Sequence, residues 1–86
     1  MTVVEYIFRV SKNIVEYTES GKEAIRYKVG ALIPLNINHF NDLVEGKTLT
    51  SYTRSGLVKF DSSNFEKEVE VIETTTSITK SIKKLS

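Results

Sequence analysis

The side chains best equipped for chemistry in this sequence are cations and tyrosines that alternate with apolar residues in extended segments. Lysine and arginine neutralise phosphates, and an exposed aromatic ring stacks on a nucleobase. Tyr17 and Tyr52 each lie between polar neighbours, which predicts exposed rings. The candidate nucleic-acid-binding residues are Arg9, Tyr17, Arg26, Lys28, Lys47, Tyr52, Arg54, Lys59, Lys80, Lys83 and Lys84.

Catalytic and metal-binding patterns are weak by comparison. His39 is the single histidine and there is no cysteine, so a metal site would depend on carboxylates such as Asp42 and Glu45. The four glycines stand apart, and none belongs to a phosphate-binding loop or a nucleophile elbow. We therefore expect a protein that is not an enzyme and that uses no metal and no cofactor.

Charge is segregated along the chain although the net charge is only +1. Residues 47–59 contain Lys47, Arg54 and Lys59 with no acid, whereas residues 61–73 contain five acids and one lysine. The last thirteen residues carry three lysines and no acid. The near-neutral total argues against a strong nucleic-acid binder, but a local basic patch can still attract a polyanion.

Size and composition predict one small domain. Eighty-six residues can bury a single core, and the absence of cysteine excludes a disulfide scaffold. Charged residues interrupt any signal-peptide pattern in the first twenty residues, and no segment approaches the ~18 apolar residues that span a bilayer. We expect a cytoplasmic protein with no membrane partner.

The first half of the chain alternates with the period of strands. Residues 2–10 place Val4, Tyr6, Phe8 and Val10 on one face, and a polar break at 11–13 is either a turn or a bend within one long strand. A second strand is predicted over residues 14–18, and a central strand over residues 23–33. A hairpin turn joins them, in which Gly21 can take a positive φ, and Pro34 ends the central strand.

The predicted binding groove is based on the cations of the central strand, residues 23–33. Its alternation places Tyr27 and Val29 in the core and directs Arg26 and Lys28 outward. Arg9 projects opposite Phe8 and can join these cations. Lys59 and Arg54 come from the hairpin that follows the helix.

A short helix is predicted after Pro34. Asn36 is a good N-cap, Phe40, Leu43 and Val44 form an apolar stripe, and Gly46 occupies the position where a left-handed residue ends a helix. The helix is about two turns long, and we expect it to cover one end of the sheet.

The remaining chain reads as strands and a tail. The predicted strands are 47–53, 57–60 and 66–73, and the outward glutamates of 66–73 are typical of an edge strand. Residues 74–86 are expected to form a basic, flexible C-terminal tail or a short amphipathic helix built on Ile78, Ile82 and Leu85.

These elements predict a mainly β fold. We expect a small OB-like or SH3-like barrel of five to six strands, with one short helix between strands three and four. Residues 1–73 would form the barrel domain and residues 74–86 the tail. The chain order resembles that of the OB-fold, and this likeness carries no function by itself.

Two functions are compatible with the sequence. The first is a small non-enzymatic module that binds nucleic acid, preferably single-stranded DNA or RNA with little sequence specificity. The alternative is a protein-interaction module, an inhibitor or assembly factor, that uses the acidic strand 66–73 and the tail. A homodimer formed by strand pairing is compatible with either function, and the composition would suit a virus or mobile element of an AT-rich host.

Overall fold

Eight strands, one α-helix and one turn of 3-10 helix make up the computed structural model, which describes residues 1–85. The mainly β character predicted from the sequence is confirmed. In chain order the elements are β1 (Val3–Arg9), β2 (Ile14–Thr18), β3 (Glu23–Tyr27), β4 (Leu32–Leu35), α1 (Ile37–Val44), β5 (Leu49–Tyr52), β6 (Gly56–Phe60), the 3-10 turn η1 (Ser62–Asn64), β7 (Glu68–Thr74) and β8 (Ile78–Lys84).

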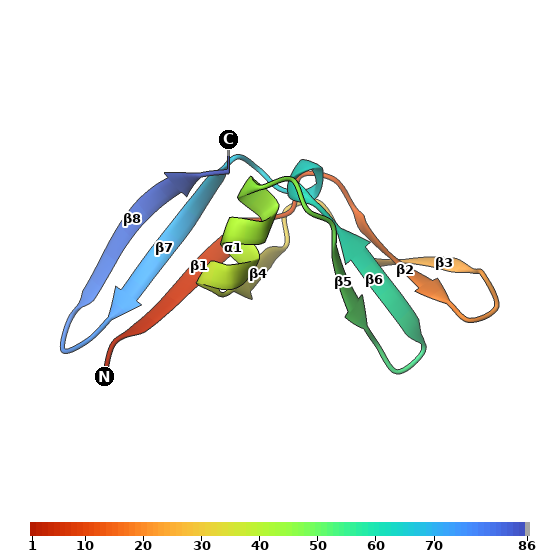
Figure 1. The fold of residues 1–86 in the computed structure, drawn as a ribbon, viewed down its shortest axis with the longest axis horizontal. Helices are drawn as coiled ribbons and strands as arrows, with labels where there is room; N and C mark the ends of the chain where they lie inside the picture. The colour runs from red at the N-terminus through yellow and green to blue at the C-terminus, as the bar shows by residue number, and fades with distance from the viewer. Residues whose placement is uncertain (86) are drawn as a thin grey trace.

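The strands form two antiparallel sheets that diverge from a common bend (Figure 1). One sheet has the order β4-β1-β7-β8, and we call it the core sheet. The other has the order β3-β2-β6-β5, and we call it the basic sheet. The radius of gyration is 14.0 Å, against about 12 Å for a compact chain of this length, so the two sheets give the protein an elongated outline.

Three segments of the chain cross from one sheet to the other at a common bend. The crossings lie between β1 and β2, between β3 and β4, and between β6 and β7. Hydrogen bonds join them there: the Val10 amide donates to Ala31, the Gly30 amide donates to Val10, and the Ser11 amide donates to Asn64, all at 2.8–2.9 Å. The polar break at 11–13 is thus a bend within one long strand rather than a hairpin.

The bend corrects the prediction for the central strand. Residues 23–33 do not form one strand, because the chain leaves the ladder at 28–31 to change sheets. Val29 is consequently 61% exposed rather than part of the core. Pro34 lies inside β4 opposite Ile7, which is tolerated because β4 is an edge strand.

The same bend changes the strand count and the place of the helix. There are eight strands instead of five or six, and α1 follows the fourth strand instead of the third. β3 and β5 are the two outer strands of the basic sheet and do not pair with each other. A closed OB-like or SH3-like barrel therefore stays a prediction.

The core lies against the inner face of the core sheet. Tyr6, Phe8 and Val10 alternate inward from β1 and its continuation, as the sequence predicted, and Val69 and Val71 face the same interior from β7. Val4, predicted for the same face, is 40% exposed. Phe8 contacts Phe65, with ring centroids 5.0 Å apart, and Phe65 is supplied by the bend.

The helix covers this core and begins where the sequence predicts. The Asn36 side chain accepts a hydrogen bond from the His39 amide at 2.9 Å, and Gly46 adopts a positive φ of 84° just beyond the helix. Phe40 packs on Tyr6 with ring centroids 4.9 Å apart. Val44 is exposed, so the predicted apolar stripe is narrower than expected.

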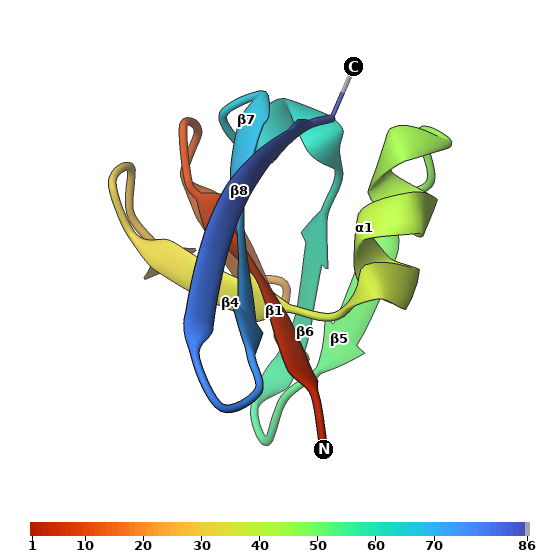
Figure 2. The same cartoon turned by 90° about the vertical axis from the view of Figure 1, so that its left-hand side faces the viewer.

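The last segment is a strand rather than a helix or a frayed end. β8 pairs with β7 along its whole length, from Glu68 opposite Lys84 to Thr74 opposite Ile78, and lies at the outside of the core sheet (Figure 2). The Leu85 amide donates to Lys67 and its side chain is buried. β7 is therefore an inner strand, and the edge strand predicted for 66–73 is β8 instead.

Candidate binding surfaces

Three of the predicted phosphate-binding cations are paired with carboxylates. Arg9 lies 3.7 Å from Glu66, Lys80 lies 3.9 Å from Glu70, and Lys47 lies 3.0 Å from Glu45. Hydrogen bonding to Glu45 raises the pKa of Lys47. Exposed pairs of this kind contribute little stability, but they reduce the positive potential that a phosphate would meet.

The three lysines near the C-terminus belong to the core sheet. Lys80 and Lys84 point to its outer face, whereas the Lys83 ammonium lies 5.7 Å from the Tyr6 ring centroid and 6.0 Å from that of Phe40. Since β8 lies at the far edge of the other sheet, the structure does not bring these lysines together with the basic hairpin at 47–59.

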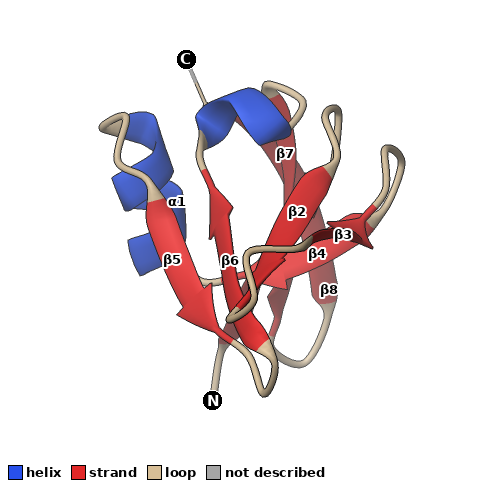
Figure 3. Ribbon diagram, turned by 90° about the vertical axis from the view of Figure 1, so that its right-hand side faces the viewer, coloured by secondary structure: helices blue, strands red, loops and turns tan. Residues whose placement is uncertain are grey.

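The two tyrosines predicted to be exposed lie in one row across the basic sheet. Leu57 of β6 pairs with Tyr17 of β2 on one side and with Tyr52 of β5 on the other. Directly paired residues share a face, so the two rings flank Leu57 on the outer face of the sheet, which Figure 3 turns toward the viewer. Tyr17 is 40% exposed and Tyr52 is 81% exposed.

Lys59 belongs to the same outer face. It is two residues beyond Leu57 on β6 and opposite Thr50 on β5. Ile25 of β3, opposite Val15 on β2, adds an apolar side chain that is 53% exposed. We call the surface made by Tyr17, Tyr52, Leu57 and Lys59 the tyrosine face.

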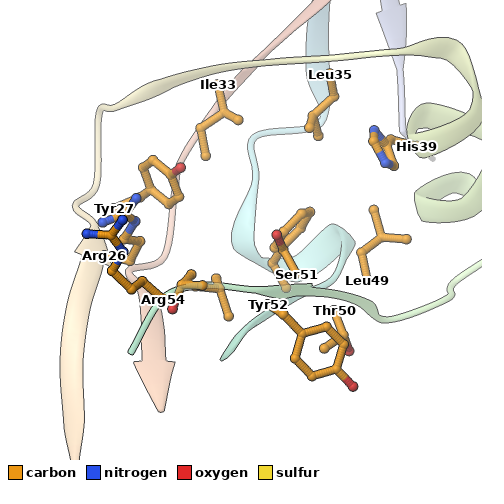
Figure 4. Close-up of a pocket in the computed structure, with 13 residues that line it drawn as sticks. Arg26, Tyr27, Ile33, Leu35, His39, Leu49, Thr50, Ser51, Tyr52 and Arg54 are labelled. Carbon is orange, nitrogen blue, oxygen red and sulfur yellow. The ribbon is translucent and has the colours of Figure 1, made fainter. Parts of the chain in front are cut away.

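The inner side of the basic sheet contains a cleft of about 520 Å³. Arg26 of β3 and Arg54 of the β5–β6 turn both line the end of it that contains Tyr27 (Figure 4). Neither arginine forms an ion pair within residues 1–85. Lys28 lies in the bend and does not line the cleft.

The groove predicted from the central strand is therefore divided. Arg26 and Arg54 face the cleft, and Lys59 faces the opposite side of the sheet. The Tyr52 ring points away from the cleft although its residue lines the cleft edge (Figure 4).

Glu16 fixes the turn that carries Arg54. Its carboxylate accepts hydrogen bonds from the Thr53 hydroxyl and, at 3.1 Å, from the Ser55 hydroxyl, on either side of Arg54. These two hydrogen bonds, with a smaller contribution from the Arg26 charge, hold the pKa of Glu16 below its usual value. The carboxylate is thus an anchor for the turn.

The middle of the cleft is apolar. Ile33 and Leu35 lie on one wall and Leu49 on the other, with His39 at the end remote from the arginines (Figure 4). The buried Nδ1 of His39 has no hydrogen-bond partner among the described residues. Sequence reasoning did not identify Leu49 or Ser51 as cleft residues, because no local pattern records the approach of β4 to β5.

Charge follows the two sheets. The basic sheet with its turns, residues 11–30 and 47–60, has seven lysines and arginines against three glutamates. The rest of the chain has five against eight acids. The excess of four positive charges on the basic sheet is hidden in the net charge of +1.

Comparison of the chain with protein families, with curated proteins and with solved structures finds no match. Function must therefore be argued from these residues. Within residues 1–85, no group of three or more His, Cys, Asp or Glu side chains could hold a metal ion. Among the described residues, α1 is the single α-helix, and it is too short to cross a membrane.

Proposed function

We propose that the protein binds single-stranded nucleic acid through the tyrosine face of the basic sheet. The observation that carries the proposal is the row Tyr17–Leu57–Tyr52, which places two exposed rings on one face of the more basic half of the chain.

Two interactions would hold a nucleic acid on this face, namely base stacking on the tyrosines and attraction of the phosphates to positive charge. Each base that stacks on a tyrosine contributes about 1–3 kcal/mol and is accepted whatever its identity. The two rings are two strands apart, roughly 10 Å, so they would contact different bases of one chain. Lys59 lies beside this row, and the positive excess of the sheet attracts the phosphate backbone.

Such binding has little sequence preference. The tyrosine face contains no Asn, Gln or Arg side chain that could read the edge of a base. A strand of DNA or RNA would both be accepted, because stacking and phosphate neutralisation do not use the sugar hydroxyl.

A salt titration with a fluorescent single-stranded oligonucleotide tests the proposal. The logarithm of the affinity should fall linearly with the logarithm of the salt concentration, and Lys59→Gln should reduce the slope by about 0.7. Thr79→Gln, an exposed change on β8, is the matched control and should leave the slope unchanged. An absence of binding at low salt would remove this function.

We propose a protein partner as the second candidate, on one observation. The outer edge of β8 is unpaired in the chain described, and Ile78 and Ile82 on this strand are 66% and 64% exposed. A strand edge with exposed isoleucines pairs with another strand, including β8 of a second copy, although its lysines weaken such pairing. Sedimentation should then show dimers that Ile82→Lys dissociates, and a monomer at all concentrations would exclude self-pairing.

A further inference from the structure

The cleft between β4 and β5 differs in chemistry from the tyrosine face on the other side of the basic sheet. Its volume of about 520 Å³ lies within the roughly 300–1,000 Å³ of small-molecule sites. We propose that this cleft binds a small amphipathic anion, namely an aliphatic chain that ends in a carboxylate.

The anionic group would lie between Arg26 and Arg54. Both guanidinium groups lack an ion-pair partner within residues 1–85. Arg26 lies 5.8 Å from the centroid of the Tyr27 ring, which supports its position at the end of the cleft. Planar guanidinium groups suit a carboxylate because they donate two parallel hydrogen bonds.

One acid lies near this end and does not compete for both arginines. The Glu16 carboxylate is engaged by the hydroxyls of Thr53 and Ser55, and it forms no ion pair with either arginine. Both guanidinium groups therefore stay available to a ligand, and Glu16 holds the turn that carries Arg54.

The middle of the cleft selects an aliphatic chain. Its apolar lining is Ile33, Leu35, Leu49, Val58 and Phe60. These five side chains have no polar atom that could hydrogen-bond the edge of a flipped base, and they suit a hydrocarbon chain better. Hydroxyl groups of the lining come from Ser51 and its neighbours on β5 and from Tyr27 near the arginines.

This site is independent of the proposed nucleic-acid surface. Strand alternation directs Tyr52 away from the cleft and Ser51 into it (Figure 4). A ligand in the cleft and a nucleic-acid strand on the tyrosine face would thus contact opposite sides of the same sheet. Loss of one binding activity would leave the other proposal standing.

The test uses decanoate below its micelle-forming concentration, with the full chain and detection by amide chemical shifts. Decanoate should bind and shift the resonances of Leu35 and Leu49, whereas decylamine, with the same chain and the opposite charge, should bind at least tenfold more weakly. Acetate, which has the head group alone, should also bind at least tenfold more weakly. Equal binding of decylamine, or of acetate, would overturn the proposal.

Two variants on neighbouring positions locate the site. Ser51→Leu fills the cleft from β5 and should weaken decanoate binding at least tenfold. Thr50 also borders the cleft, but its side chain points away from it (Figure 4), so Thr50→Leu should leave decanoate binding unchanged. The double variant Arg26→Gln/Arg54→Gln should abolish the preference for decanoate over decylamine. Unchanged decanoate binding by Ser51→Leu, or an unchanged preference in the double variant, would overturn the proposal.

Discussion

The core sheet and the basic sheet are connected by three crossing segments but differ in what their side chains do. Of the twelve buried apolar residues that line the core of the described chain, only Ile14 and Val58 belong to the basic sheet. The others come from the core sheet, the helix and the bend. Both sheets expose apolar side chains, but the exposed rings of Tyr17 and Tyr52 and most of the positive charge belong to the basic sheet.

We propose that this difference separates stability, in the core sheet, from recognition, in the basic sheet. Burial against α1 stabilises the core sheet, whose alternation is cleanly apolar inside. The basic sheet is held to the core sheet by the three crossing segments and by the hydrogen bonds at the bend. Its surface can therefore vary without loss of the fold, which is the property that a binding surface needs.

The largest expected effect is the loss of a core ring. Phe8→Ala removes a fully buried side chain from the core sheet and should cost about 3–5 kcal/mol of unfolding free energy. Tyr52→Ala on the basic sheet should change stability by less than about 0.5 kcal/mol. Urea denaturation measures both, and similar losses in the two variants would contradict the division.

A second prediction concerns the contact between β2 and β6. A Cβ added at Gly56 would lie 1.9 Å from the Tyr17 carbonyl oxygen, so backbone must move to admit it. Gly56→Ala should cost about 1–3 kcal/mol and should also weaken oligonucleotide binding by displacing Tyr17. Thr50→Ala is the control on β5, and thermal unfolding with a binding titration would show whether stability and binding fall together.

Removing either exposed tyrosine ring tests whether the basic sheet, and not the core sheet, determines oligonucleotide affinity. Tyr17→Ala and Tyr52→Ala should each weaken single-stranded oligonucleotide binding by about 1–3 kcal/mol, or roughly 5–150-fold. Leu32→Ala, on the core sheet at an exposure of 57%, between those of the two tyrosines, should leave the affinity unchanged. Fluorescence anisotropy measures the three affinities, and equal losses would show that the tyrosine face has no special role.

The smallest effect is the pH dependence of the β5–β6 turn. The folded protein holds the pKa of Glu16 below the unfolded value near 4.5, so its contribution to stability is complete above that pH. It is lost as the pH falls through the lower folded value, when the carboxylate takes a proton. Glu16→Gln should flatten this acid-side loss, measured by thermal unfolding between pH 3 and pH 6. An unchanged profile would mean that the Thr53 and Ser55 bonds contribute nothing.

Local patterns predicted the parts of the fold that local physics determines. The alternation of Tyr6 and Phe8 located the buried face of β1, and the Asn36 cap located the start of α1. The exposure of Tyr17 and Tyr52 also followed from their polar neighbours.

The bend and the last strand could not be read in the same way. Val29 lies outside the core at the bend, where the Asn13 side chain, sixteen residues earlier in the chain, accepts a hydrogen bond from the Val29 amide at 2.9 Å. Pairing of β8 depends on β7 rather than on its own apolar spacing, which equally fits a helix. Arg26 and Arg54 line the same cleft because β3 and the β5–β6 turn lie near each other in the fold. The alternation of residues along a strand does not predict such an approach.

Chemical-shift mapping of the full chain with a single-stranded oligonucleotide tests the central claim most directly. The account predicts that the largest amide shifts fall on Tyr17, Leu57 and Tyr52, with Lys59 beside them, and that β7 and β8 stay unperturbed. Shifts concentrated on β8, or none at low salt, would contradict the assignment of recognition to the basic sheet.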